Sequence, residues 1–263
     1  MGFFKSFPAS VAALAAGLAL TLAAPVRAEE LTADQIAAKM VRGNGFTWEG
    51  AKTKLRMVLI DSKGSKNERS LEVLGRRHEK LLETVVRFLS PQDVAGTAFL
   101  MKEKSGGGSE QHIYLPGLKR TRRIVGRERE GSFMGSDFTY ADLSRKEEKD
   151  VKNKKLPDEK VGSDDTYVVE STPGTVEAGG YSRVRAWVRK TDFVALRTKF
   201  FDASGKLQKT LYVRRIKDLE GKPVVVEARM QSENGHATEL VVDGIERKEN
   251  LPDSLFTATA LER

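Results

Sequence analysis

The sequence has no cysteine and only three histidines, and both shortages narrow the chemistry available to the protein. Without cysteine, the chain forms no disulfide, no cysteine-ligated zinc site, no iron–sulfur cluster and no thiol nucleophile. The histidines, His78, His112 and His236, are scattered, which argues against a histidine-rich metal site or a histidine-based triad. We therefore expect no catalytic residues, no metal and no cofactor, and we predict a binding or carrier protein rather than an enzyme.

Long apolar runs are also rare, and the one that exists lies at the N-terminus. Residues 1–28 have the pattern of a secretory signal peptide, in which Lys5 precedes an apolar run over 11–24 and the small residues Val26 and Ala28 precede the expected cut. The run is shorter than the about 20 residues that cross a bilayer, which disfavours an uncleaved anchor. We predict export to the periplasm, cleavage after Ala28 and only peripheral contact with a membrane.

Aromatic residues make up 7% of the chain, charged residues 31% and hydrophobic residues 39%. These fractions exclude a disordered chain and suit a globular protein with a buried core. The formal net charge is +8, and removal of residues 1–28 takes away two positive charges. A basic exported protein is expected to meet anionic lipid head groups or acidic partners rather than nucleic acid, although mild positive charge also serves solubility alone.

After the signal peptide, the periodicity predicts one helix followed by many strands in a single domain over 29–263. Thr32 and Gln35 form a capping-box pattern, and apolar residues four apart predict a short amphipathic helix over 33–42. An alternation of period two then predicts roughly ten strands. Their expected ranges are 53–61, 69–75, 80–89, 97–103, 111–115, 120–125, 181–190, 193–201, 207–217, 223–231 and 237–242.

The short links between these strands predict an antiparallel meander and exclude parallel crossover units. One large sheet must close as a barrel or curl over helices to cover its apolar face. The short helices expected over 33–42, 138–144 and 254–261 are too small to fill that face, so we expect a residual apolar cavity. The glycine-rich segment 105–109 and the charge run 146–160 are interpreted as solvated loops.

The most distinctive segment, 111–143, contains a cluster of cations. Lys119, Arg120, Arg122 and Arg123 place four positive charges within five residues. Such a cluster can bind an anionic head group or an acidic partner through charge-assisted hydrogen bonds. The alternative is a charged edge strand that prevents aggregation.

The end of the same segment is apolar and rich in glycine. Phe133, Met134 and Phe138 are interleaved with Gly131 and Gly135. This pattern fits a mobile apolar flap over the mouth of a cavity. The alternative is a loop that is buried as a plug in the core.

Three stretches resemble one known family. SPQDVAGTAFLM (90–101), YLPGLKRTRRI (114–124) and GSFMGSDFTYADL (131–143) resemble the outer-membrane lipoprotein-sorting protein family of LolA-like periplasmic proteins, and LPDSLFT (251–257) is similar to the C-terminal ends of that superfamily. The resemblance covers about residues 50–258. It implies a mainly β fold with few helices, in which a single curved antiparallel sheet forms a half-open barrel with helices in its concavity.

The resemblance also implies a function. The lipoprotein carrier of that superfamily binds the acyl chains of lipoproteins in its cavity, takes them from an inner-membrane transporter and hands them to an outer-membrane receptor. Some members resemble partners of RND-type lipid exporters, so the implied partners are a lipid or an acylated lipoprotein, an inner-membrane RND-type or other lipid exporter, and an outer-membrane acceptor. Other LolA-like proteins are anti-sigma regulators that bind partner proteins, so the alternative is an envelope interaction or sensor module.

Apolar burial alone can hold an acyl chain in such a cavity, at about 0.8 kcal/mol per buried methylene group. Periodicity does not distinguish residues that line a cavity from residues that fill a core. The candidate lipid-binding residues are Leu55, Met57, Leu59, Val86, Phe88, Phe99, Met101, Phe133, Met134, Phe138, Leu196, Phe200, Val226 and Met230.

Overall fold

The computed structural model describes residues 1–2, 30–43, 50–105, 108–143, 151–174, 180–248 and 250–263. The chain separates into two compact units, Met1–Glu30 and Leu31–Arg263, and the fold described here is that of the second unit. Most of the predicted signal peptide, with its cut after Ala28, lies outside the described residues. The division of the chain into a signal peptide and one domain therefore stays a prediction.

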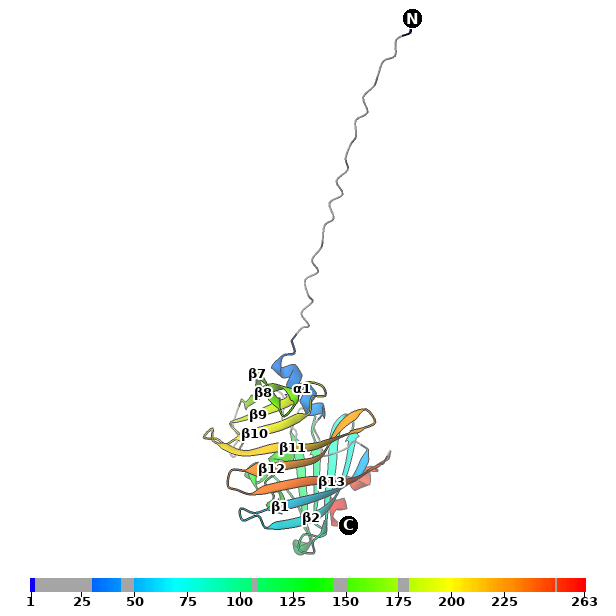
Figure 1. Ribbon diagram of the computed structural model, residues 1–263. Helices are drawn as coiled ribbons and strands as arrows, with labels where there is room; N and C mark the ends of the chain where they lie inside the picture. Colours follow the sequence, from blue (N-terminus) through cyan, green and yellow to red (C-terminus); the bar gives the residue numbers. More distant parts are fainter. Residues whose placement is uncertain (3–29, 44–49, 106–107, 144–150, 175–179, 249) are drawn as a thin grey trace. The chain divides into compact units, whose positions relative to one another are not determined.

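The described residues form one helix, α1 (Ala33–Gly43), and thirteen strands (Figure 1). The strands are β1 (Ala51–Ile60), β2 (Lys66–His78), β3 (Leu81–Ser90), β4 (Ala98–Glu103), β5 (Ser109–Leu115), β6 (Arg120–Arg123), β7 (Val151–Val161), β8 (Asp164–Pro173), β9 (Arg183–Arg189), β10 (Ala195–Phe201), β11 (Leu207–Leu219), β12 (Lys222–Ser232) and β13 (Ala237–Arg247). Six short 3-10 turns complete the described elements: η1 (Pro116–Leu118), η2 (Gly126–Glu130), η3 (Phe133–Gly135), η4 (Ala141–Leu143), η5 (Asp253–Leu255) and η6 (Thr259–Glu262).

All thirteen strands belong to one antiparallel sheet, whose spatial order is β6-β5-β4-β3-β2-β1-β13-β12-β11-β10-β9-β8-β7. The first and last strands of the chain's sheet, β1 and β13, pair in the middle, with Met57 opposite Leu240. The edges are β6 and β7, and the sheet does not close between them within the described residues. The predicted fold class, a mainly β protein built on one open antiparallel sheet, is confirmed.

Helix α1 begins where the capping pattern placed it. The Thr32 amide donates to Gln35 Oε1 at 2.8 Å, and the Gln35 amide donates to Thr32 Oγ1 at 3.2 Å. Ile36 is fully buried against Val169 and Val188 of strands β8 and β9. The helix therefore covers one end of the sheet rather than its middle.

The region before β9 differs from the expected structure in two ways. The charge run 146–160 was expected to be a solvated loop, but Val151–Val161 forms the edge strand β7, whereas 146–150 lies outside the described residues. Strand β8 was not predicted at all, although Val168 and Val169 are buried in it. Strand β7 lies at an edge of the sheet, where charged side chains protect a strand from pairing with another chain. Its lysines and acids leave too few apolar residues for an alternation of period two to be visible in the sequence.

The α-helices predicted over 138–144 and 254–261 are not formed in the described parts of these segments. The first segment contains the 3-10 turn η4, and the second contains η5 and η6. The C-terminal segment lies over β2, β3 and β4, where the ring of Phe256 is fully buried. The guanidinium of Arg76 lies 4.3 Å from the centre of that ring.

Strands β2, β3 and β4 bury both faces. On β3, Val85 packs toward Phe256 and the C-terminal segment, whereas the next residue, Val86, packs in the main core on the other face. Neighbours on β4 divide in the same way, with Leu100 in the C-terminal cluster and Phe99 in the main core. Because neighbouring side chains on a strand point to opposite faces, a run of apolar residues is needed where both faces are covered.

We predict that Phe256→Ala lowers the free energy of unfolding by about 3–5 kcal/mol, because it empties a fully buried aromatic position. Urea denaturation measures the change. Leu118→Ala is the matched control, since Leu118 is 69% exposed and its loss should change stability by less than about 0.5 kcal/mol. Equal stabilities of the two variants would show that the C-terminal segment does not cover the sheet.

Candidate functional site

The segment Gly131–Leu143, here called the flap, lies against the main core of the sheet. An isolated antiparallel bridge joins Ser132 to Thr139 and closes the flap on itself. Inside it, the Ser136 hydroxyl donates to the Phe133 carbonyl at 2.7 Å. Met134 and Gly135 have positive φ values of 52° and 76°, a left-handed conformation that glycine adopts at low cost. These local features make the flap a compact loop.

The flap inserts aromatic side chains into the core. Phe133 is 2% exposed, and the centre of its ring lies 5.2 Å from that of Phe99 and 5.8 Å from that of Phe88. The ring of Tyr140, also in the flap, lies edge-on to Phe133 at 5.5 Å. These are favourable separations for aromatic pairs. Of the two interpretations of this segment, the structure shows the buried plug.

An apolar cavity of about 90 Å³ remains between the flap and the sheet. It is lined by Leu55, Met57, Leu71, Val73, Thr84, Val86, Phe99, Met101, Phe133, Phe138, Leu143 and Leu240. Its volume equals that of about three water molecules in the liquid, at ~30 Å³ each. A residual apolar cavity was expected, and one is present, but it is small because the flap's own rings fill most of the space.

The structure brings most of the predicted lipid-binding residues together. Those that line the cavity are Leu55, Met57, Val86, Phe99, Met101, Phe133 and Phe138. Those that belong to the same core cluster without lining the cavity are Phe88, Met230, Leu59, Met134 and Phe200. Two residues lie elsewhere: Leu196 packs with Val194 and Val225 in a separate cluster, and Val226 is buried outside both clusters.

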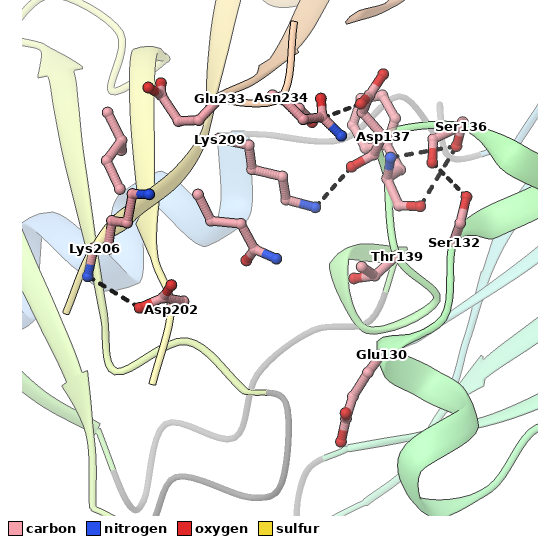
Figure 2. Close-up of a pocket in the computed structure, with 14 residues that line it drawn as sticks. Glu130, Ser132, Ser136, Asp137, Thr139, Asp202, Lys206, Lys209, Glu233 and Asn234 are labelled. Atoms are coloured by element: carbon pink, nitrogen blue, oxygen red, sulfur yellow. Dashed lines mark hydrogen bonds between the residues drawn. The ribbon is translucent and has the colours of Figure 1, made fainter. Parts of the chain in front are cut away.

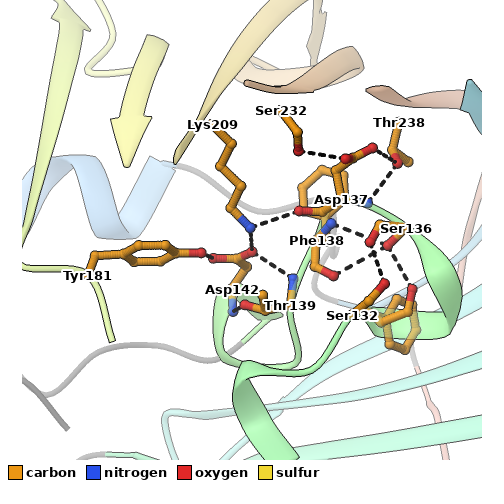
Figure 3. A network of polar contacts seen from close by, with 11 residues as sticks. Ser132, Ser136, Asp137, Phe138, Thr139, Asp142, Tyr181, Lys209, Ser232 and Thr238 are labelled. Atoms are coloured by element: carbon orange, nitrogen blue, oxygen red, sulfur yellow. Dashed lines mark hydrogen bonds and ion pairs between the residues drawn. The ribbon is translucent and has the colours of Figure 1, made fainter. Parts of the chain in front are cut away.

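A buried ion pair holds the flap to strand β11 (Figure 3). Lys209 Nζ lies 2.5 Å from Asp142 Oδ2 and donates to the carbonyl of Asp137 at 2.8 Å. The side chains of Lys209 and Asp142 are only 3% and 6% exposed. The Tyr181 hydroxyl donates to Asp142 Oδ1 at 2.8 Å, so that carboxylate binds a cation and a phenol. A buried pair with these additional hydrogen bonds is costly to break from one side.

The environment of Tyr181 keeps its hydroxyl protonated. Burial raises the pKa of the Tyr181 phenol above its ordinary value, and the negative charge of Asp142 raises that pKa further. A protonated phenol can donate its hydrogen bond to Asp142 throughout the physiological pH range.

Asp137 fastens the middle of the flap to the β12–β13 turn region. Its carboxylate accepts hydrogen bonds from the hydroxyls of Ser232 at 2.6 Å and Thr238 at 2.7 Å. The Asp137 amide donates to Thr238 Oγ1 at 2.9 Å (Figure 3). This side chain thus joins the flap to β12 and β13.

On the other side, the flap is held by Arg69 of β2. Its guanidinium donates to the carbonyl of Met134 and lies 6.0 Å from the centre of the Phe88 ring. Desolvation by burial lowers the pKa of Arg69, and the charge of Asp93 opposes that shift. Arg69 Nε is buried and has no hydrogen-bond partner among the described residues.

A second, larger depression lies beside the flap and is called here the polar cleft (Figure 2). Its volume is about 470 Å³. It is lined by Glu130, Ser132, Ser136, Asp137, Phe138, Thr139, Asp202, Lys206, Leu207, Gln208, Lys209, Ser232, Glu233 and Asn234. Phe138 lines both the polar cleft and the apolar cavity, so the two spaces adjoin at this side chain.

The predicted head-group residues lie away from both spaces. Arg120, Arg122 and Arg123 are on β6, an edge strand of the sheet, and Lys119 immediately precedes it. Arg122 pairs with Glu128 at 2.5 Å, and none of these four cations lines the cavity or the cleft. Their place at an edge agrees with the alternative interpretation, that charge protects the edge strand from aggregation.

Sequence reasoning missed the residues that hold the flap: Arg69, Asp137, Asp142, Tyr181 and Lys209. Each is a common polar residue in a strand or loop, and its partner is distant in the sequence. Among the described residues, no group of three histidine or acidic side chains is placed to hold a metal ion. No described helix is long and apolar enough to cross a membrane.

Comparison with known proteins identifies the family. A family model described as an uncharacterized protein matches residues 81–263. An outer membrane lipoprotein-sorting protein domain from Vibrio parahaemolyticus is 30% identical, with a TM-score of 0.80 over 88% of this chain and 98% of that chain. The chain therefore belongs to the outer membrane lipoprotein-sorting protein family, as its motifs indicated.

Two further structures share the fold. A DUF1329 family protein from Desulfovibrio piger is 25% identical, with a TM-score of 0.80 over 87% of this chain and 97% of that chain. A LolA superfamily protein from Nitrosomonas europaea is 20% identical, with a TM-score of 0.67 over 87% and 98% of the two chains. The comparison with curated proteins finds no match. The fold of this chain is thus similar to that of a LolA superfamily protein.

We predict that Asp142→Asn lowers the free energy of unfolding by about 3–5 kcal/mol, because it leaves the Lys209 ammonium buried without its carboxylate. The double variant Asp142→Asn with Lys209→Met should be more stable than Asp142→Asn alone, since methionine is apolar and the site includes the rings of Tyr181 and Phe200. Urea denaturation of a double-mutant cycle measures the coupling.

The control for this cycle is Glu227→Gln, which breaks the exposed pair between Arg215 and Glu227. Exposed pairs contribute at most about 1 kcal/mol. If Asp142→Asn cost no more than this control, the ion pair would not be what holds the flap.

Proposed function

We propose that this protein is a periplasmic carrier that binds the acyl chains of lipids or lipoproteins under the flap and moves them toward the outer membrane. The observation that carries the proposal is an apolar cavity whose cover is a separate loop, with Phe133 and Phe138 inserted where a hydrocarbon chain would lie. The lipoprotein-sorting domain to which the chain is 30% identical supports it.

Displacement of the flap is required for this function. The present cavity of about 90 Å³ has room for only a few methylene groups, so an acyl chain must replace the rings of Phe133 and Phe138. Each methylene group of the ligand that is buried contributes about 0.8 kcal/mol, which offsets the apolar burial that the two rings lose. Met57 and Met101 in the wall can adapt to chains of different shape.

The contacts that hold the flap are suited to such an exchange. Beside the packing of its rings, which an acyl chain would replace, they are hydrogen bonds and one ion pair made by Arg69, Asp137 and Asp142. Water or a partner's polar groups can replace hydrogen bonds at a small net cost, typically about 0.5–1.5 kcal/mol each. The flap can therefore open as a unit while the sheet remains folded.

Export and delivery complete the proposal. Cleavage after Ala28 would release the domain into the periplasm, where an inner-membrane exporter, of the RND type or another, supplies the lipid and an outer-membrane acceptor receives it. The relative described as an outer membrane lipoprotein-sorting protein domain supports delivery to the outer membrane. The head group or the acyl-linked protein would remain outside the apolar cavity.

The small size of the cavity also favours a second candidate, an interaction or sensor module that binds a protein and carries no lipid. In that case the flap is a permanent part of the core, as its 2% exposed Phe133 would allow. The two functions differ in whether acyl chains bind to the purified protein.

We predict that delipidated protein binds a fluorescent fatty acid, and that lipids extracted from the native envelope displace it. Native mass spectrometry of protein purified from that envelope should show a bound lipid. Val86→Glu is the informative variant, because it places a carboxylate in the apolar wall and should weaken probe binding at least about tenfold. Absence of any acylated ligand would falsify the carrier and favour the interaction module.

A disulfide that holds the flap closed tests whether acyl chains enter the apolar cavity beneath it. The amide and the carboxylate of Asp137 both contact Thr238 Oγ1, at 2.9 and 2.7 Å, so a disulfide between these two positions would tie the flap to β13, and the chain has no cysteine of its own. We expect the Asp137→Cys, Thr238→Cys variant to bind the fatty-acid probe at least about tenfold more weakly when oxidised than when reduced. Thr238→Cys alone is the control and should not respond to oxidation. Unchanged uptake by the oxidised variant would rule out the flap as the entrance.

A further inference from the structure

The polar cleft has a chemistry that the apolar cavity does not explain. Its lining contains the carboxylates of Glu130, Asp137, Asp202 and Glu233 and the ammonium groups of Lys206 and Lys209. Carboxylates therefore outnumber cations in it. Its volume of about 470 Å³ is several times that of the apolar cavity.

Some of these groups are already engaged in the fold. Asp137 is bound by Ser232 and Thr238, and Lys209 is bound by Asp142. The carboxylate of Asp202 accepts hydrogen bonds from Ser204 and from the amide of Lys206 at 3.0 Å. These residues shape the cleft and keep little capacity for a ligand.

Other groups remain available. Among the described residues, no hydrogen bond or ion pair engages the side chains of Glu130, Gln208 or Glu233. Lys206 adds an exposed ammonium group on the same lining. Two carboxylates, an amide and an ammonium group complement a ligand that carries both a positive and a negative charge. A purely anionic ligand would meet carboxylates in excess.

The position of the cleft connects it to the apolar cavity. Phe138 lines both spaces, and its neighbours Asp137 and Thr139 line the cleft alone. A ligand that displaces Phe138 from the cavity would therefore have its polar end at the cleft. This is the arrangement that an amphiphile requires, with its tail in one space and its head in the other.

We infer that the polar cleft is the head-group subsite of the carrier, and that it selects zwitterionic, ammonium-bearing head groups such as phosphoethanolamine. Glu130 and Glu233 lie on opposite sides of the cleft and each offers a carboxylate to the ammonium group, while Lys206 binds the phosphate (Figure 2). This inference rests on the proposed function, because it assigns the head of the amphiphile whose acyl chain lies under the flap. It moves head-group recognition from the cations of β6 to the cleft.

Two lysolipids that share a myristoyl chain test the inference. Lysophosphatidylethanolamine should displace the fluorescent fatty acid with an affinity about fivefold higher than that of lysophosphatidylglycerol, since each partly exposed ionic contact contributes modestly. The Glu130→Gln, Glu233→Gln variant should lose this preference and still bind the fatty-acid probe. Equal affinities of the two lysolipids for the wild-type protein would overturn the inference and leave the carrier function intact.

Glu79→Gln is the matched control. Glu79 is an exposed carboxylate in the β2–β3 turn, whereas the cleft includes the β12–β13 turn. Ile60 pairs with both Lys66 and Ala237, so the β1–β2 turn and the β12–β13 turn lie at the same end of the strands. The β2–β3 turn, with Glu79, lies at the other end. Glu79→Gln should keep the full preference. If it reduced the preference as much as the cleft variant, a general loss of negative charge would be the cause and the subsite would be refuted.

A head group without a tail separates the subsite from the carrier function. Glycerophosphoethanolamine should shift the amide resonances of Ser232, Glu233 and Asn234 in the wild-type protein, and not in the Glu130→Gln, Glu233→Gln variant. Shifts without any binding of fatty acid would retain the subsite for a free solute and refute the carrier. Absence of shifts together with equal lysolipid affinities would refute the subsite alone.

Discussion

The structure depends on one constraint, which is that an open antiparallel sheet must cover a wide apolar face. Thirteen strands pair from β6 to β7 without closing, and the apolar residues of β1 to β5, β12 and β13 meet in one cluster. The flap supplies the missing cover with the rings of Phe133, Phe138 and Tyr140. Removal of that cover would expose an apolar patch that soluble proteins seldom leave open. The flap therefore cannot be displaced without a substitute, and a hydrocarbon chain is a chemically equivalent one.

Two segments cover the sheet, and each combines apolar packing with polar contacts. The C-terminal segment packs Phe256 and Leu261 against β2 to β4, and Arg76 both lies over the Phe256 ring and pairs with Asp253. The flap packs its aromatic rings in the main core and makes polar contacts from Arg69 on one side to Lys209 on the other. Of the two covers, the flap lines the apolar cavity and the C-terminal segment does not. In the proposed carrier, the flap is therefore the cover that an acyl chain would displace.

The sequence predicted the architecture where one face of a strand is apolar and the other polar. The alternation of Leu55, Met57 and Leu59 was sufficient to place β1, and the same pattern placed most strands on both sides of it. It failed for β7, whose exposed edge is made of charged residues, and for β8 beside it. The wall of the cavity was partly predictable because seven of its residues belong to such alternating strands or to the flap motif. The size of the cavity was not predictable, because it depends on how far Phe133 and Phe138 enter it.

The polar residues around the flap were beyond sequence reasoning for a different reason. Lys209 and Asp142 are separated by 67 positions, and Thr238 and Asp137 by 101. No local pattern marks such residues, since a lysine on a strand is ordinarily a solvated side chain. They are recognised only when the fold shows a charged group buried beside its partner.

The contacts of these residues also affect how the proposed amphiphile would bind. Asp137 and Lys209 line the polar cleft while they hold the flap closed, so opening of the flap would change the lining that the head group meets. Binding of the head and opening for the tail would then be coupled through those shared contacts, because a ligand shifts an equilibrium only through its different affinities for the two states.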